Sequence, residues 1–285
     1  MGLQEGENIQ HSMVTKTIER AQKKVEENNF GIRKRLLEYD DVMNSQRTII
    51  YTLRKNALKG EKLKIDISNM LYDTIQEIVA SNKDANDYKN FEFDLITNFS
   101  VTSPISEEDF SNKDGSEIID NLYKNLSDYY ERKKEQNKEL AFPVIRNVFE
   151  NKGNNYKRIV VPFTDGAKVI NISTDLKESF ESKCKSLIDD FEKNISLAII
   201  DDKWKVHLKK MDELKQSVQL AVHEQKDPLL IYKFEAYELF KNMIVDLNKE
   251  LLSFLFKGSL PNNENNIKEA AQPNKNRNYQ TSKDE

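Results

Sequence analysis

Residues 199–240 read IIDDKWKVHLKKMDELKQSVQLAVHEQKDPLLIYKFEAYELF and predict two helices folded back on each other. Apolar residues of the first helix recur at three- and four-residue steps until about Leu220, as one helical face requires. The second helix is predicted to start at Asp227-Pro228, because Asp accepts hydrogen bonds from free N–H groups and Pro fits the first turn. We expect the helices to lie antiparallel and to pack stripe against stripe. The stripe of the second helix comprises Leu230, Phe234, Tyr237, Phe240, Ile244, Leu247, Leu251 and Phe254.

A single long helix is predicted over residues 14–58. Its length would be about 65 to 70 Å at 1.5 Å per residue. A helix of that length is not buried by itself, so periodicity alone favours a coiled coil or a bundle rod. The step from Ile32 to Leu36 interrupts a strict heptad, which favours a helix that contacts several partners. Polar Asn28 and Gln46 fall on its apolar stripe, which otherwise comprises Ile18, Ala21, Val25, Ile32, Leu36, Tyr39, Met43, Ile50, Leu53 and Ala57.

Two blocks of sequence carry a family resemblance. Residues 29–47, NFGIRKRLLEYDDVMNSQR, are similar to the long helix of the helical scaffold domain of SecA, the motor ATPase family of bacterial preprotein translocation. That family typically has an acidic residue at the position of Gly31. The resemblance is strong over residues 1–58 and 188–257 and weak between them. The helix pair resembles the two-helix finger of the same family at Ile200-Asp201, Trp204, His207-Leu208, Met211-Asp212, Leu214, Gln225-Lys226-Asp227-Pro228, Tyr232-Lys233, Glu235-Ala236 and Leu239-Phe240.

The chain divides into five segments by pattern and resemblance. These are a polar lead (1–13), the scaffold helix (14–58), a helical wing domain (59–187), the two-helix finger (188–258) and a polar tail (259–285) that we expect to be disordered. In the wing, amphipathic stretches at 67–79, 118–138 and 140–150 are separated by polar runs at 81–89 and 103–115. Thr164-Asp165-Gly166 lies between two short apolar runs, which predicts a β-hairpin over 158–173 with Pro162 on an edge strand. The expected fold is therefore mainly α and elongated.

Composition limits the class of protein. The chain has 44 lysines and arginines against 48 acidic residues, a net charge of −4, and this balance argues against a nucleic-acid-binding protein. With 38% hydrophobic and 32% charged residues, it suits amphipathic helices around a modest shared core. The single cysteine, Cys184, forms no internal disulfide, and we find no signal peptide and no apolar run of some twenty residues. We expect a cytoplasmic protein, peripheral on the cytoplasmic face of the inner membrane when assembled.

Nucleotide-binding motifs are missing from the sequence. A P-loop needs glycines and a lysine at fixed spacing so that backbone N–H groups surround phosphates, and the eight glycines here are scattered. The resemblance covers only the C-terminal helical portion of SecA, so ATP and Mg would be bound by nucleotide-binding domains outside it, and we expect no ATPase activity from this chain alone. The family often ends in a zinc module with three cysteines and a histidine. Because the tail here has no cysteine, we expect no zinc.

For each other candidate site in the sequence, a structural interpretation is favoured over a functional one. Cys184 with His207 has the residue types of a nucleophile and base, but an isolated cysteine near apolar residues is usually a packing residue. Adjacent acids at Asp40-Asp41, 107–109 and 201–202 lack a calcium-loop pattern and are expected to be solvated. Basic residues at 33–35 and 209–210 are expected to lie on solvent-exposed helix faces, with anionic lipid as a secondary contact. We therefore predict no catalytic, cofactor or metal residue.

The resemblance implies a mechanical role. In the SecA family the finger enters the cytoplasmic mouth of the SecYEG channel, and its tip lies near the translocating polypeptide. This implies contact with channel and preprotein for Leu220, Ala221, Val222, His223, Glu224, Gln225 and Lys226, although many members have Gly-Tyr where this chain has Val222-His223. Contacts between scaffold and neighbouring domains are assigned to Arg33, Arg35, Glu38, Tyr39, Asp40, Asp41, Trp204 and His207.

We expect Trp204 to pack where the finger meets the scaffold helix, and His207 to make a hydrogen bond there instead of binding metal. The implied partners are the SecYEG channel, an unfolded preprotein, and the nucleotide-binding and preprotein cross-linking domains of the parent protein. The implied function is to couple ATP hydrolysis in those domains to translocation, through the scaffold helix and the finger. The alternative is a free-standing helical coiled-coil scaffold or interaction protein with no link to secretion.

Overall fold

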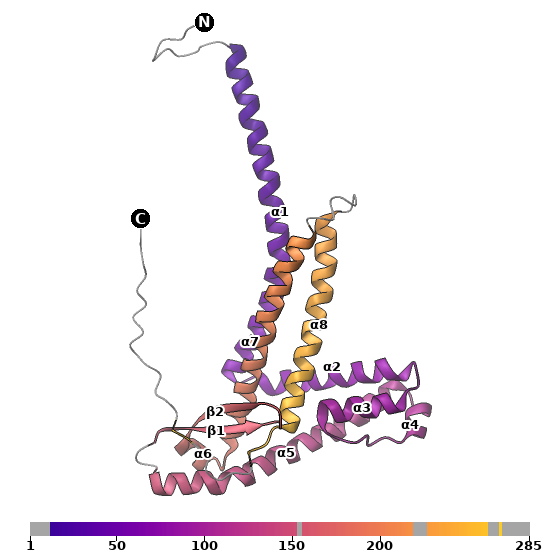
Figure 1. Ribbon diagram of the computed structural model, residues 1–285, viewed down its shortest axis with the longest axis vertical. Helices are drawn as coiled ribbons and strands as arrows, with labels where there is room; N and C mark the ends of the chain where they lie inside the picture. The colour runs from indigo at the N-terminus through magenta and orange to yellow at the C-terminus, as the bar shows by residue number, and fades with distance from the viewer. Residues whose placement is uncertain (1–11, 153–155, 219–226, 262–267, 270–285) are drawn as a thin grey trace. The chain divides into compact units, whose positions relative to one another are not determined.

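The computed structural model describes residues 12–152, 156–218, 227–261 and 268–269 (Figure 1). In these ranges the chain is mainly α-helical, as the sequence predicts. The elements in chain order are α1 (Ser12–Lys59), α2 (Leu63–Lys83), α3 (Tyr88–Phe99), α4 (Glu107–Asn112), α5 (Gly115–Lys152), β1 (Arg158–Thr164), β2 (Val169–Asp175), α6 (Leu176–Glu181), α7 (Lys185–Ser217), α8 (Pro228–Lys257) and β3 (Lys268–Glu269).

Contacts within the chain divide it into two units. The first comprises Met1–Tyr51 and Lys205–Asn242, and the second comprises Thr52–Trp204 and Met243–Glu285. The division crosses α1, α7 and α8, so each of these helices contributes residues to both units.

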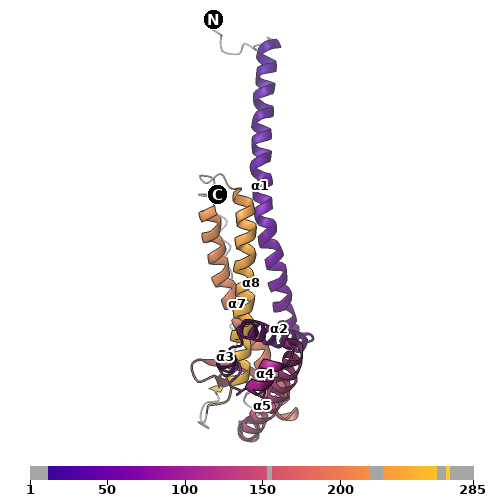
Figure 2. The same cartoon turned by 90° about the vertical axis from the view of Figure 1, so that its right-hand side faces the viewer.

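In the first unit, segments of α1, α7 and α8 lie side by side (Figures 1 and 2). Their shared apolar cluster has a buried centre formed by Met211 and Val218 of α7 with Tyr232 and Ala236 of α8. The helix pair α7–α8 is therefore antiparallel and packed, as predicted. Partly buried residues around this centre are Tyr39, Val42 and Met43 of α1, with Leu214, Ile231 and Leu239 of the pair.

The predicted inward face of α8 is confirmed at Leu247, Leu251 and Phe254, which are buried, but is wrong over the first turns of the helix. Leu230, Phe234 and Tyr237 are 67%, 68% and 62% exposed, whereas Tyr232 and Ala236 are 1% and 0% exposed. Both sets have helical spacing, so periodicity did not distinguish two neighbouring apolar faces. The small side chain of Ala236 lets α1 approach the backbone of α8, which a large residue on that face would prevent.

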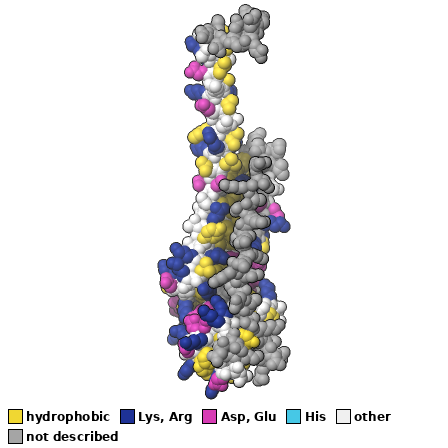
Figure 3. Space-filling view, turned by 90° about the vertical axis from the view of Figure 1, so that its left-hand side faces the viewer, with side chains coloured by type: hydrophobic (Ala, Val, Ile, Leu, Met, Phe, Trp, Pro, Cys, Tyr) yellow, Lys and Arg dark blue, Asp and Glu magenta, His cyan; other side chains and the backbone are white. Residues whose placement is uncertain are grey.

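The apolar stripe of α1 is buried only along its second half. In the first half Ile18, Val25, Ile32 and Leu36 are exposed, and Figure 3 shows hydrophobic side chains open to view along that first half. Tyr39 is the first residue of α1 that packs against the apolar cluster of α7 and α8.

In the second unit, helices α3 and α4 pack against each other through aromatic side chains. Phe91 of α3 stacks on Phe110 of α4 with ring centroids 4.5 Å apart. The polar run at 103–115 thus contains a short helix, since the Ser106 side chain accepts a hydrogen bond from the Asp109 N–H at its start. The stretches predicted at 118–138 and 140–150 are one helix, α5, which continues through Pro143 because buried Ala141 and Ile145 pack on both sides of it.

The predicted hairpin is present in the second unit. β1 pairs antiparallel with β2 from Arg158↔Asp175 to Thr164↔Val169, and the turn places Gly166 at φ +94°. Within the described part, the strand order is β2-β1-β3, so β1 with its Pro162 is the middle strand and not the predicted edge strand.

Proline is accommodated in β1 because the second edge of this strand is paired only at its ends. Thr164 exchanges two backbone hydrogen bonds of 2.9 Å with Ser259, and β3 pairs with Ile159 and Val160. Backbone groups alternate in direction along a strand, so the groups of residue 162 face the same edge as those of Thr164. Pro162 lies between the two paired stretches, where no N–H is required. β3 itself lies in the tail for which the sequence predicts no secondary structure.

Candidate functional site

Three helices of the first unit meet at one buried side chain. Gln46 of α1 is 6% exposed, and its amide nitrogen donates to the backbone carbonyl of Ala236 on α8 at 3.0 Å. Its amide oxygen lies 2.9 Å from Nε2 of His207 on α7. Because the Gln46 nitrogen faces Ala236, the oxygen is the atom that faces His207, and Nε2 of His207 donates the hydrogen bond. A single side chain of α1 therefore joins both helices of the pair.

His207 is held in its neutral form. It is 1% exposed, and its ring packs edge-on against Phe240 of α8 with centroids 5.6 Å apart. Burial, with a smaller contribution from the Lys210 charge, lowers the pKa of His207 to about 4. At neutral pH the ring carries one N–H, which suits a fixed hydrogen bond to Gln46. This agrees with the predicted structural role of His207.

A pair of tyrosines extends the junction along α1. The rings of Tyr39 and Tyr232 lie 4.7 Å apart at 58°. Burial raises the pKa of Tyr232 to about 12, with smaller contributions from Asp40, Tyr39 and Asp212. The hydroxyl therefore stays protonated, and the pair contributes ring packing between α1 and α8.

The structure brings together only some of the predicted scaffold residues. Tyr39 and His207 belong to the junction just described. Trp204 is buried but belongs to the second unit. Glu38 is half-buried, while Arg33, Arg35, Asp40 and Asp41 are exposed on α1. The predicted tip residues, Leu220 through Lys226, lie outside the described residues.

Sequence reasoning did not assign a role to Gln46. The signal was present, because a polar residue on the apolar stripe of a helix needs a partner when that stripe is buried. Asn28 shows the same pattern but is exposed, so the pattern alone did not tell the two apart.

In the second unit, α1 also contacts α7. The guanidinium of Arg54 makes two hydrogen bonds to the Asp201 carboxylate, at 2.8 and 3.2 Å. Further along, the Glu250 carboxylate of α8 pairs with Lys203 of α7 and with Lys168 beside the hairpin turn, each at 2.7 Å. Asp201 thus has a structural partner, and no group of three or more His, Cys, Asp or Glu suited to a metal occurs among the described residues.

Cys184 is not set up as a nucleophile. It is fully buried, and burial raises the pKa of its thiol to about 11, whereas a reactive cysteine needs a lowered pKa. Of the helices that the structure describes, none has the length and apolar composition of a membrane span.

Comparison with known proteins gives one consistent result. The family model for the SecA Wing and Scaffold domain matches residues 8–259. The chain is 64% identical over its full length to the protein translocase subunit SecA of Flavobacterium psychrophilum and 58% identical to that of Christiangramia forsetii, covering 26% of each. It is 50% identical to the same subunit of Cytophaga hutchinsonii over 92% of this chain and 23% of the relative. The chain thus spans about a quarter of the length of these relatives.

Proposed function

The chain belongs to the SecA wing and scaffold family, and we propose that it is the force-transmitting part of a preprotein translocase subunit. In this role it couples ATP hydrolysis by other domains to the movement of an unfolded preprotein through the SecYEG channel. Nucleotide and Mg bind to those other domains, and the protein works peripherally at the cytoplasmic face of the inner membrane. Membership of the family leaves no observation that favours an unrelated coiled-coil scaffold.

The observation that carries the proposal is the Gln46 junction. A displacement of α1 reaches α7 through the hydrogen bond to His207 and α8 through the hydrogen bond to Ala236. Buried hydrogen bonds are geometrically demanding, because breaking one leaves a desolvated group that costs about 1 to 3 kcal/mol. The helix and the finger therefore follow each other's movement within the first unit.

The exposed half of α1 supports contact with further domains. Ile18, Val25 and Ile32 follow one another at seven-residue steps on one face of α1 and are 53%, 59% and 51% exposed. Large apolar side chains in such a row mark an interaction surface. We assign this surface to the nucleotide-binding and preprotein cross-linking domains, and the exposed Arg33, Arg35, Asp40 and Asp41 to the polar rim of the same contacts.

The outer face of the finger supports contact with the channel or its cargo. Leu230, Phe234 and Tyr237 recur at steps of four and three residues and form one exposed apolar row on α8. This row begins close to the tip, Leu220 to Lys226, to which we assign contact with the translocating chain. Anionic lipid is a secondary contact of the basic helix faces.

The test uses the full-length subunit with Gln46→Leu. We expect ATPase activity to persist, since the nucleotide-binding domains are unchanged. The amount of preprotein moved per ATP hydrolysed should fall several-fold, because α1 no longer holds α7 and α8 through the Gln46 hydrogen bonds. Ser45→Ala is the matched control, because its hydroxyl bonds only within α1, to the Asp41 carbonyl. Unchanged coupling in a folded Gln46→Leu protein would contradict the proposal.

A second measurement addresses the tip. Single cysteines at Val222 or His223 are expected to form cross-links to a stalled preprotein or to the channel in an assembled translocase. The absence of adducts at both positions would remove the tip assignment and leave the Gln46 junction untouched.

A further inference from the structure

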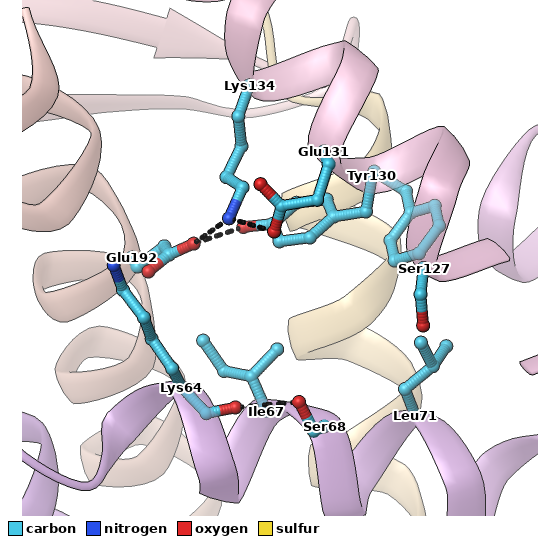
Figure 4. Close-up of a pocket in the computed structure, with 10 residues that line it drawn as sticks. Lys64, Ile67, Ser68, Leu71, Ser127, Tyr130, Glu131, Lys134 and Glu192 are labelled. Carbon is cyan, nitrogen blue, oxygen red and sulfur yellow. Dashed lines mark hydrogen bonds and ion pairs between the residues drawn. The ribbon is translucent and has the colours of Figure 1, made fainter. Parts of the chain in front are cut away.

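A buried carboxylate lies where the finger helix α7 passes the wing helix α5. Glu192 of α7 is 2% exposed, and its Oε1 accepts a hydrogen bond from the Tyr130 hydroxyl at 2.9 Å. The ammonium of Lys134 lies 3.6 Å from the same oxygen. Tyr130 and Lys134 are four residues apart and so share one face of α5 (Figure 4). Both donors therefore approach Glu192 from the wing side.

The surroundings make this position of the carboxylate specific. A cavity of about 90 Å³ adjoins the cluster, and Ile67 and Leu71 of α2 with Phe256 of α8 form its apolar walls. The Tyr130 ring is itself stacked on Phe256, with centroids 5.1 Å apart. Packing thus fixes the Tyr130 donor in place, while Lys64, Ser68 and Ser127 add polar groups to the cavity lining.

The electrostatics of the cluster agree with the geometry. Burial raises the pKa of Glu192, while Lys134 and the Tyr130 hydrogen bond oppose this shift. Burial, followed by the nearby Glu192 charge, raises the pKa of Tyr130 well above its usual range. Tyr130 consequently remains a hydrogen-bond donor. The carboxylate is stabilised mainly by its two α5 partners, with a smaller contribution from the charge of Lys64 on α2, which also lines the cavity.

We propose that Glu192 is a positioning residue that sets the register of α7 against α5. A slip of α7 by one helical turn would carry the carboxylate about 5.4 Å from both donors. An all-apolar contact at this place would tolerate such a slip, whereas a buried charge with two fixed donors opposes it. Helices α5 and α7 then keep a single alignment along their lengths. The consequence for transmission rests on the proposed function, but the register itself does not.

A register role differs from a stabilising role in what it predicts. Replacing a whole buried ion pair by apolar residues of similar volume is often neutral or stabilising, whereas removing one partner of the pair is destabilising. Neither change in the free energy of unfolding identifies a register role. The decisive quantity is therefore the position of α7 relative to α5, and the free energy of unfolding is a secondary readout.

The experiment measures this position in the 285-residue chain by pulsed electron paramagnetic resonance. Spin labels are attached to Arg132→Cys on α5 and Ala198→Cys on α7, which are both exposed. Cys184 stays in place, because a fully buried thiol whose pKa is raised to about 11 resists labelling. The unsubstituted cluster should give one narrow distance distribution.

Glu192→Leu should broaden this distribution or add a second peak displaced by about 5 Å, one helical turn. Glu192→Gln keeps the shape and an acceptor oxygen, and it should retain the single narrow peak. Glu131→Leu is the matched control: its carboxylate also contacts Lys134, but its side chain is 67% exposed, so the single peak should persist.

A folded Glu192→Leu chain with the unchanged narrow distribution would overturn the proposal. Should that variant not fold, Tyr130→Phe is measured instead, since it removes the 2.9 Å donor and keeps the stacked ring. An unchanged distribution in this variant is equally adverse, and a broadened one supports the register role. Neither result depends on translocation, so failure here is distinguishable from failure of the Gln46 coupling test.

Discussion

Nε2 of His207 lies 2.9 Å from Oε1 of Gln46, although 161 residues separate the two positions in the chain. The same amide group reaches the Ala236 carbonyl at 3.0 Å, so one side chain of α1 joins α7 and α8. This contact ties the first block of family resemblance to the second, and it explains why a polar residue interrupts the apolar stripe of α1.

Gln46→Leu should lower the free energy of unfolding of the 285-residue chain by about 2 kcal/mol. The substitution takes one hydrogen-bond partner from His207 and one from the Ala236 carbonyl, and both groups are buried. Urea denaturation followed by circular dichroism measures the change. Ser45→Ala, on the exposed side of the same turn, should stay within about 0.5 kcal/mol of the unsubstituted chain. Equal midpoints for the two variants would argue against the junction.

Acidification should destabilise the fold through His207. The pKa of its ring is lowered to about 4 in the folded state. Below pH 6.5 the unfolded chain binds a proton at this position while the folded chain does not, so stability present above pH 6.5 is lost progressively as the pH falls towards 4. The full loss is roughly 3 kcal/mol.

The comparison for this pH effect is His207→Gln, which removes the titrating ring. The difference in unfolding free energy between the two proteins should change with pH between about 6.5 and 4, because all other groups titrate in both. A difference that is constant over this interval would mean that His207 is not held neutral by burial.

Two glycine substitutions should have opposite effects. A Cβ at Gly258 would lie 2.7 Å from the Phe254 carbonyl oxygen and 2.8 Å from the Phe191 ring, so Gly258→Ala should cost about 2 kcal/mol. A Cβ at Gly31, inside α1, meets nothing within 4 Å, and Gly31→Ala should stabilise the helix by up to about 1 kcal/mol. Thermal unfolding of both variants shows whether the melting temperature falls for Gly258→Ala and rises for Gly31→Ala. A stabilised Gly258→Ala chain would show that the close approach to Phe191 is wrong.

The ion pairs of Glu250 should be sensitive to salt. Its carboxylate contacts Lys168 and Lys203, and these hydrogen bonds lower the pKa of Glu250. Because the groups are partly exposed, Glu250→Gln should cost no more than about 1 kcal/mol at low ionic strength, and less in 1 M salt. Asp246→Asn, one turn earlier on α8 and exposed, is the control. An equal, salt-independent effect of both substitutions would remove the assigned role of the pairs.

Local sequence signals predicted the secondary structure well where one element depends on its own residues. The predicted start at Asp227-Pro228 is the start of α8, with the Asp227 carboxylate accepting from the Leu229 N–H, and the predicted hairpin turn has a glycine with positive φ at residue 166. The short helices α4 and α6 were not predicted, although Ser106 and Asp175 cap their starts. The predicted separation of 118–138 from 140–150 was wrong: α5 runs through both stretches and through Pro143, because a helix with buried residues on both sides tolerates the loss of one backbone hydrogen bond.

Predictions that depended on which face meets which partner were less accurate. Leu230, Phe234 and Tyr237 have the spacing of a core stripe and are exposed, while Tyr232 and Ala236 occupy the core. The assignments of Arg33, Arg35, Asp40 and Asp41 to interdomain contacts, and of Leu220 to Lys226 to the tip, stay predictions.

The sequence by itself determined the long helices α1, α7 and α8, the antiparallel packing of α7 and α8, the hairpin and the family, because periodicity, turn residues and short motifs lie in neighbouring positions. Only the tertiary structure decided that Gln46 joins His207 to Ala236 and that Glu192 is held by Tyr130 and Lys134. These contacts join residues far apart in the chain, and a buried polar group is stabilised only by the partners that folding brings to it.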